Sequence, residues 1–397
     1  MKLSSRERML EAIEHRETDY VPCCFMIFGA LRDKCKDRYE FVQKQLALGL
    51  DATVDLPMLP LRVTSDHSDV RGLPVSFHPR IKIKEWREER EGERYPILYK
   101  EYHTPGGILS TAVNQTDDWP HGDHVPFLDD YLVPRSRKYL VENQKDLEAL
   151  RYLLPPPTAE DIQSFRTQSK EAKKFAAKHG LLVTGGWGVG IEAAGWLCGL
   201  QNTILLAMDK PAFVEELAEL LYDWNRQRME IFLDEGVDLF IRRGWYEGTD
   251  FWSPRLYRQF ILPSLAEEIQ LAHQAGAKFG YIMTSGSMPL LDMFADVGLD
   301  VLIGVDPVQG QDTDLAVMKQ KLSGKVCLWG GVNGFVTVEM GSKAEVKEAV
   351  HTAIKTLAPG GGFILSPVDN IRDTSQHTWE NVMTMLEAWK EVREYSQ

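Results

Sequence analysis

Short apolar runs alternate with helical stretches along the second half of the chain. The spacing of apolar residues predicts helices at 159–179, 211–235, 254–275 and 342–357, and each leads into a short apolar run. Short apolar strands separated by helices indicate parallel pairing, with both faces of the sheet covered. The alternation therefore predicts an α/β fold.

The number of apolar runs predicts how this sheet is arranged. We expect strands at 21–28, 51–57, 181–187, 237–247, 278–285, 301–306, 326–333 and 362–366. Eight parallel strands with intervening helices close into a (β/α)8 TIM barrel, whose active site lies at the carboxyl ends of the strands. An open, doubly wound sheet is the alternative architecture.

A stretch of different character interrupts this pattern near the N-terminal third. Between approximately residues 60 and 140, proline and charged residues are frequent, and alternating segments at 82–87, 95–103 and 107–113 indicate hairpins. We interpret the stretch as a β-rich insertion, which ends at the prolines 155–157. The prediction is one barrel domain over residues 1–397 that carries this insertion.

Composition limits the class of partner and the compartment. The net charge is -13, with the acidic residues scattered, which argues against nucleic acid and anionic membranes as partners. No apolar run approaches the length of a membrane span, and the N-terminus lacks the apolar core of a signal peptide. The five cysteines form no CxxC pair, which favours a reducing compartment. We expect a cytoplasmic protein, with its oligomeric state left open and a homodimer as one option.

Several motifs point to one known family. The opening segment 5–13 with Asp19–Pro22, the helix 252–263, the run Gly330–Asn333 and the segment 358–371 resemble the uroporphyrinogen decarboxylase superfamily. The resemblance implies a TIM barrel. It also implies one of two activities: decarboxylation of a porphyrinogen, or methyl transfer together with a corrinoid (cobalamin-type) protein.

Two departures from the motifs of this superfamily separate its branches. The decarboxylases carry an arginine-rich segment after the first strand that grips several carboxylates, whereas here Arg32 is the sole cation within 25–33 and Asp33 offsets it. The thiol-directed methyltransferases carry zinc ligands where this chain has Met283, Ser285 and Asp369, which are a poor set for zinc. The chain is thus more similar to the methyltransferases, without the usual zinc ligands and with its metal content unassigned.

Candidate catalytic residues follow the fourth barrel strand. Tyr246 and Glu247 lie at its expected end, and Asp250 lies just past it. Two carboxylates and a phenol at a barrel mouth can act as general acid or base. The alternatives are that Asp250 or Ser253 caps the next helix, and that Glu247 is a solvated surface residue.

Candidate substrate-binding residues come from several strand ends. Trp187, Tyr281 and Trp329 would suit a flat, apolar substrate, although such rings can also fill the barrel. The remaining candidates are Met283, Ser285, Asp306, Asn333, Asp369, Asn370 and Arg372, with His103 from the insertion. Turn formation is the alternative role for the aspartates and asparagines, and packing for the histidine.

These observations favour a methyltransferase of one-carbon metabolism. The expected reaction is O-demethylation of a small methoxylated compound, for example an aryl methyl ether, onto the corrinoid of a partner protein. A decarboxylase acting on uroporphyrinogen or a related acid is one alternative, with Arg242, Arg243 and Arg372 as the few expected cations at the mouth. A barrel that binds a corrinoid or another ligand without catalysis is the other.

Overall fold

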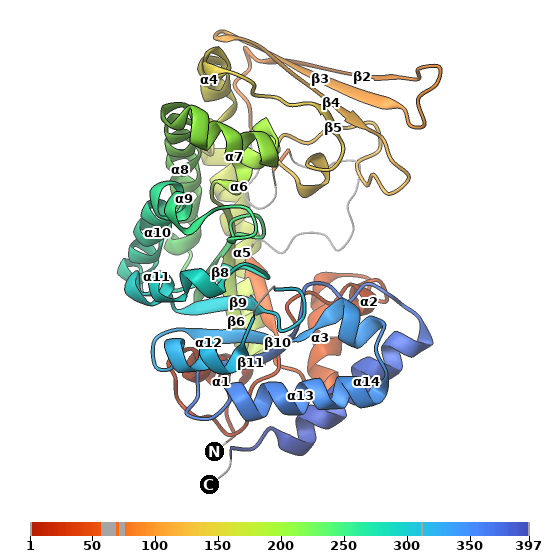
Figure 1. The fold of residues 1–397 in the computed structure, drawn as a ribbon, viewed down its shortest axis with the longest axis vertical. Coiled ribbons are helices and arrows are strands. Elements are labelled where there is room, and N and C mark those ends of the chain that lie inside the picture. The colour runs from red at the N-terminus through yellow and green to blue at the C-terminus, as the bar shows by residue number, and fades with distance from the viewer. Residues whose placement is uncertain (1, 57–68, 71–75, 311–312, 396–397) are drawn as a thin grey trace.

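The computed structural model describes residues 2–56, 69–70, 76–310 and 313–395. A curled parallel sheet with helices packed around it occupies one end of the molecule, and an antiparallel sheet lies at the other end (Figure 1). The predicted α/β barrel with a β-rich insertion is confirmed. Among the described residues, no helix combines the length and apolar character needed to cross a bilayer.

The parallel sheet has the strand order β1-β6-β7-β8-β9-β10-β11, and all neighbours pair in parallel. Its strands carry mostly buried side chains, as expected of a sheet covered on both faces. The strands are β1 (Thr53–Leu56), β6 (Leu182–Val189), β7 (Leu239–Arg243), β8 (Lys278–Ile282), β9 (Val301–Val305), β10 (Cys327–Asn333) and β11 (Phe363–Val368).

The expected strand at 21–28 is not a regular strand, so the prediction of eight strands is wrong by one. This segment makes only two isolated parallel bridges to the β11 side, Cys23 to Leu365 and Ile27 to Asn370. On its other side, the Asp51 amide donates to the Cys23 carbonyl at 2.8 Å. Pro22 has no N–H to give to a ladder, which limits regular pairing here. The segment nevertheless stands between β11 and β1, where an eighth strand would close the barrel.

Helices cover the outside of the sheet, and their ends follow local signals. α5 begins after its cap Thr158 and ends at Gly180, which has a φ of 61°. The helices are α1 (Ser5–Ile13), α2 (Gly29–Arg32), α3 (Arg38–Leu48), α4 (Gln144–Leu150), α5 (Ala159–His179), α6 (Glu192–Cys198), α7 (Leu200–Asp209), α8 (Pro211–Asp234), α9 (Pro254–Phe260), α10 (Leu262–Gln274), α11 (Leu291–Asp296), α12 (Leu315–Leu322), α13 (Lys343–Leu357) and α14 (Gln376–Val392). Short 3-10 turns lie at η1 (Asp130–Leu132), η2 (Arg151–Leu153) and η3 (Met288–Leu290), and a π-helix at η4 (Gly334–Glu339).

The insertion forms the antiparallel sheet. Its strands are β2 (Lys82–Glu88), β3 (Ile97–Thr104), β4 (Gly107–Asn114) and β5 (Ser136–Lys138), in the order β2-β3-β4-β5. The insertion shares a core with the barrel, because its buried Leu98 and Tyr102 belong to the same apolar cluster as Phe279 of β8. Between β4 and β5, the chain passes through η1 and reaches the barrel mouth.

Candidate functional site

A cleft with a volume of about 1260 Å³ lies at the carboxyl ends of the barrel strands. Its walls come from the N-terminal segment at 24–29, from α3, from the strand ends and from the insertion. This is the end of a barrel where side chains from separate strands meet. The cleft is the candidate active site.

Aromatic rings form much of the cleft wall. Trp245, Tyr246 and Phe251 follow β7, and Phe25 comes from the N-terminal segment. Trp329 of β10 also lines the cleft and is held in place by its indole N–H, which donates to the Cys24 carbonyl at 2.8 Å. Rings fixed in this way offer faces on which a flat substrate can stack.

One tyrosine hydroxyl and two carboxyl groups reach the cleft from distant parts of the chain. Tyr246 follows β7, Asp369 follows β11, and Asp130 belongs to η1 of the insertion. Asp369 has a φ of 65°, a conformation that non-glycine residues adopt rarely and mainly at functional sites. Burial raises the pKa of Asp369 and also the pKa of Tyr246. Both groups therefore hold their protons more tightly than they would in water.

Arg243 joins the insertion to the barrel at this cleft. Its Nε donates to Glu192 Oε2 at 2.7 Å, and its Nη2 donates to Asp130. The guanidinium carbon lies 4.7 Å from the ring centre of Trp245, close enough for a cation–π contact. Glu192 also accepts from the Tyr246 amide at 2.9 Å, and burial raises the pKa of Glu192 to about 7. One buried carboxylate thus fixes both the arginine and the start of the Tyr246 turn.

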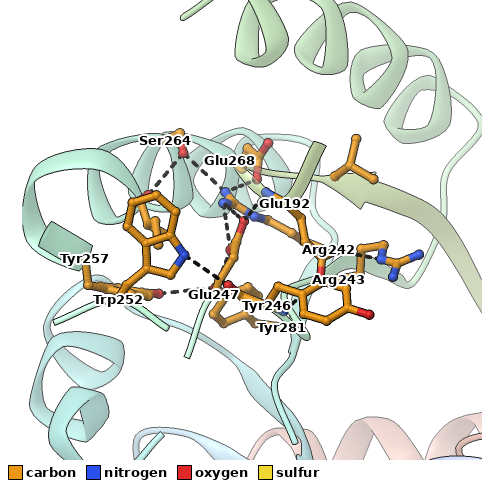
Figure 2. Close-up of polar contacts among 12 residues, drawn as sticks. Glu192, Arg242, Arg243, Tyr246, Glu247, Trp252, Tyr257, Ser264, Glu268 and Tyr281 are labelled. Atoms are coloured by element: carbon orange, nitrogen blue, oxygen red, sulfur yellow. Dashed lines mark hydrogen bonds and ion pairs between the residues drawn. The ribbon is translucent and has the colours of Figure 1, made fainter. Parts of the chain in front are cut away.

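Arg242 points away from Arg243 into a second, fully buried cluster (Figure 2). It lies 3.0 Å from Glu247 and 2.9 Å from Glu268 of α10, and the Tyr281 hydroxyl donates to Glu247. Adjacent residues of a strand point to opposite faces, which explains the separation of the two arginines. Glu247 and Tyr281 consequently lie behind the wall, outside the described lining of the cleft, and neither the acid role nor the substrate contact predicted for them fits this position.

Other predicted site residues also lie elsewhere in the described structure. Asp250 is exposed and outside the cleft lining, and Ser253 rather than Asp250 caps α9. Met283 is 1% exposed and belongs to the core. His103 lies on β3 in the insertion sheet, with its Nε2 at 3.0 Å from Glu101.

Asp306 and Asn333 hold the ends of two neighbouring strands together. The Asn333 side chain donates to Asp306 at 2.7 Å, and the Val308 amide donates to Asp306 at 2.8 Å. Both residues are almost completely buried and lie outside the described cleft lining. Their turn-forming role, named above as the alternative, is the one that the structure shows.

Six of the predicted residues do meet at the cleft: Tyr246, Ser285, Trp329, Asp369, Asn370 and Arg372. Asn370 also accepts a bond of 2.9 Å from the Gly29 amide, which ties the N-terminal segment to β11. Trp187 lies within β6, but its side chain is outside the described part of the structure.

Sequence reasoning missed several residues that line the cleft. Asp55 points into it from the end of β1 and accepts a hydrogen bond from the Thr184 hydroxyl. Its place near the end of an apolar strand was a usable signal. Asp118, Asp130 and Arg135 also line the cleft, but they come from the insertion, and nothing in the local sequence predicted where that segment would dock.

The prediction of few cations at the mouth is wrong. Arg242 is buried elsewhere, but five arginines line the cleft: Arg32, Arg38, Arg135, Arg243 and Arg372. Arg243 and Arg372 were expected there, whereas Arg38 and Arg135 were not. The five come from four segments that lie far apart in sequence, so no local arginine-rich motif marks them.

Unlike the arginines, side chains that could bind a metal ion form no cluster among the described residues. Within the described residues, no group of three or more histidine, cysteine, aspartate or glutamate side chains is arranged to hold a metal ion. All five cysteines have free thiols, and four of them are buried. The metal assignment left open by the sequence stays open.

Comparison with known proteins gives a matching family model and several solved structures of similar fold. The family model described as "Uroporphyrinogen decarboxylase (URO-D)" matches residues 122–392. A search of the curated proteins found no match. Among solved structures, the chain is similar to a methyltransferase from Methanosarcina mazei, with 16% identity, coverage of 98% of this chain and 99% of that chain, and a TM-score of 0.60. This likeness shows a shared fold over nearly the whole chain.

A second solved structure is less similar. It is a B12-independent methionine synthase from Shewanella sp. W3-18-1 in complex with selenomethionine, with 10% identity. The match covers 56% of this chain and 65% of that chain, with a TM-score of 0.36. A likeness of this size carries no argument about function.

Proposed function

The chain belongs to the uroporphyrinogen decarboxylase family, and on that premise we propose that it is a methyltransferase. In this proposal it removes the methyl group of a small methoxylated compound, such as an aryl methyl ether, and passes it to a corrinoid carried by a partner protein. The observation that carries the proposal is the aromatic cleft at the barrel mouth, onto which Tyr246 and Asp369 both open. The fold shared with a methyltransferase agrees with it.

The cleft wall suits a flat substrate. Trp245, Tyr246, Phe251 and Trp329 lie within one cavity. Stacking of an aromatic substrate on such rings adds about 0.5–1.5 kcal/mol per pair beyond the burial of apolar area. An aryl ether would gain this energy, whereas an aliphatic methoxy compound would not.

The reaction needs an acid near the ether oxygen. When the methyl carbon–oxygen bond breaks, the electron pair stays on oxygen, and an alkoxide or phenolate is a poor leaving group without a proton or a hydrogen bond. Tyr246 can donate a hydrogen bond from its hydroxyl, and burial raises the pKa of Asp369, which favours the protonated carboxyl. We assign proton donation to this pair in place of Glu247, which lies outside the cleft.

The size of the cleft fits a second reactant. Sites for small molecules usually measure about 300–1,000 Å³, and this cleft is larger at about 1260 Å³. A corrinoid would supply the reduced cobalt that accepts the methyl group. The residues of this chain would hold the ether against the aromatic wall, with its methyl group toward the open side of the cleft.

A decarboxylase is the second candidate, because five arginines line the cleft. Guanidinium groups are the usual partners of substrate carboxylates. Three of them, however, are already paired with a carboxylate of this chain, Arg32, Arg135 and Arg243. This pairing favours the methyltransferase.

The test is a methyl-transfer assay. The protein is incubated with a reduced corrinoid protein and a panel of methoxylated compounds, and methylcobalt formation is followed by absorbance. Methylation that depends on this protein and on an aryl methyl ether supports the proposal. Carbon dioxide release from uroporphyrinogen without methyl transfer would favour the decarboxylase, and ligand binding without either reaction would indicate a non-catalytic barrel.

Tyr246→Phe tests the assigned acid. Loss of the hydroxyl removes one hydrogen bond to the departing oxygen, and general acid groups contribute about 10²–10⁴-fold to rates. We expect methyl transfer to fall at least tenfold, with the melting temperature unchanged. Tyr152→Phe is the matched control, because Tyr152 is exposed on η2 and the substitution removes the same hydroxyl group away from the cleft. Equal rates for the two variants would remove Tyr246 from the mechanism.

A further inference from the structure

Positive and negative side chains are balanced in the lining of the cleft. The five arginines are matched by five aspartates: Asp33, Asp55, Asp118, Asp130 and Asp369. The described lining contains no lysine and no glutamate. With all ten groups ionised, the formal charge of the described wall is zero, and it is +1 while Asp369 carries the proton that the proposed function assigns to it.

The pairing is local as well as numerical. Arg135 Nη2 lies 2.5 Å from Asp118, and Arg32 Nε lies 3.5 Å from Asp33. Burial raises the pKa of Asp369, and Arg372 is near enough to offset part of that effect. Arg38 also has an interaction partner. Arg135 and Arg243 are thus held by hydrogen-bonded carboxylates, and Arg32 lies within ion-pair distance of one.

Two carboxyl groups, those of Glu192 and Asp55, lie outside these pairs. Arg243 is shared between Asp130 of the cleft and Glu192 behind it. Asp55 accepts its hydrogen bond from a neutral hydroxyl, that of Thr184. The cleft therefore has no large excess of positive charge, although five arginines line it.

We propose that the substrate of this cleft bears no carboxylate, and that the enzyme selects uncharged methoxyarenes against anionic ones. The inference rests on the proposed function and narrows its substrate class. A carboxylate placed in this cleft would lose its hydration and would have to displace an aspartate from an arginine. A paired guanidinium cannot repay that cost, because the displaced aspartate then loses its own partner.

Binding measurements test the selection without any turnover. The probes are para-methoxybenzamide and para-methoxybenzoate, which are similar in shape and differ in charge, and para-methoxybenzamidine as the cation. Binding is followed by isothermal titration and by the fluorescence of the tryptophans that line the cleft, Trp245 and Trp329. We expect the amide to bind at least tenfold tighter than the benzoate, a difference of about 1.4 kcal/mol.

A single substitution should reverse part of this selection. Asp118→Asn removes the partner of Arg135, while Arg135 stays fixed by its bonds to the Thr116 hydroxyl at 2.7 Å and to the Tyr131 carbonyl at 3.1 Å. The variant therefore presents a fixed, unpaired cation to the cleft. We expect its affinity for the benzoate to rise at least fivefold, with that for the amide unchanged. Asp117→Asn is the matched control, because it removes the same charge from an exposed neighbour outside the described cleft lining and should change neither affinity.

Each outcome bears on the inference. Equal or tighter binding of the benzoate by the unaltered protein overturns it, and so does an unchanged benzoate affinity in Asp118→Asn. Tightest binding of the benzamidine would overturn it too, by showing that the carboxylates of the wall select cations. Methyl transfer from an aliphatic methoxy compound without binding of any arene would reject this inference and keep the proposed function. Selective binding of the amide without methyl transfer would keep this inference and reject the proposed function.

Discussion

Glu192 is a buried carboxylate whose ionisation we expect to affect stability near neutral pH. Its side chain contacts Arg243, the turn at Tyr246 and, through Arg243, the insertion residue Asp130. Burial raises its pKa from 4.5 to about 7, because desolvation outweighs the attraction of Arg243. The folded protein therefore holds a proton that the unfolded chain has already released at pH 6.

The direction of the pH effect follows from this shift. A carboxyl with a raised pKa stabilises the fold fully below its unfolded pKa, and that stability is lost as the pH rises through the folded pKa. Between pH 6 and pH 8, we expect the free energy of unfolding to fall by about 1.4 kcal/mol from this group alone. Glu192→Gln has no such proton and should lack this part of the decline. Denaturant unfolding of both proteins at the two pH values measures the difference. An equal fall in the free energy of unfolding for both proteins would show that Glu192 is not the group responsible.

Burial could be predicted from the sequence for apolar residues, but not for the charged pairs. Tyr246 and Asp369 were correctly placed at the cleft, because strand ends can be recognised from the change from apolar to polar residues. Glu247 has the same local pattern as a mouth residue, yet it pairs with Arg242 of β7, which also binds Glu268 of α10. Only the three-dimensional arrangement shows that Glu247 forms an ion pair with Arg242 behind the cleft wall.

Gly190 lies at the joint between β6 and α6, where the buried charged side chains leave no room for a Cβ. A Cβ at Gly190 would overlap the guanidinium of Arg242 and the carboxylate of Glu247. Gly190→Ala should therefore separate this buried pair, and breaking such pairs costs about 3–5 kcal/mol. We expect the free energy of unfolding to drop by about 3 kcal/mol or more.

Gly195→Ala in α6 provides the control for that joint. Its added Cβ would lie 3.4 Å from Leu200 Cδ1, which is ordinary contact, and alanine is favoured over glycine within a helix by up to about 1 kcal/mol. This variant should be as stable as the unaltered protein or slightly more so. A similar loss in both variants, measured by urea unfolding, would show that the joint is sensitive to any added methyl group.

Regular elements were predicted more closely than irregular ones. The expected helix 159–179 matches α5 residue for residue, since a capping threonine and a terminal glycine mark its ends. The π-helix Gly334–Glu339 and the short strand Ser136–Lys138 were not predicted. Their shape depends on contacts with distant segments, such as the bond from Asn381 to the Val338 carbonyl, which no local pattern encodes.

At the scale of the whole molecule, the insertion and the barrel share one apolar core. Buried side chains of the insertion, among them Leu98, Tyr102 and Phe127, belong to the same continuous cluster as Phe279 and Leu328 of the barrel. The bridge from Asp130 to Arg243 adds a polar connection at the cleft. A chain whose parts are joined in this way should lose its structure as one unit.

Chemical denaturation can test that unity. Trp119 is a buried ring of the insertion, and Trp329 lies in β10 of the barrel. Comparison of the Trp119→Phe and Trp329→Phe variants with the unaltered protein isolates the fluorescence change of each tryptophan. We expect both changes to have the same midpoint in urea, and far-UV circular dichroism to have that midpoint as well. An earlier midpoint for the Trp119 signal would mean that the insertion unfolds by itself. In that case, the cleft would lose Asp118, Asp130 and Arg135 while the barrel remained folded, and the charge balance that we assign to substrate selection would depend on the insertion staying docked.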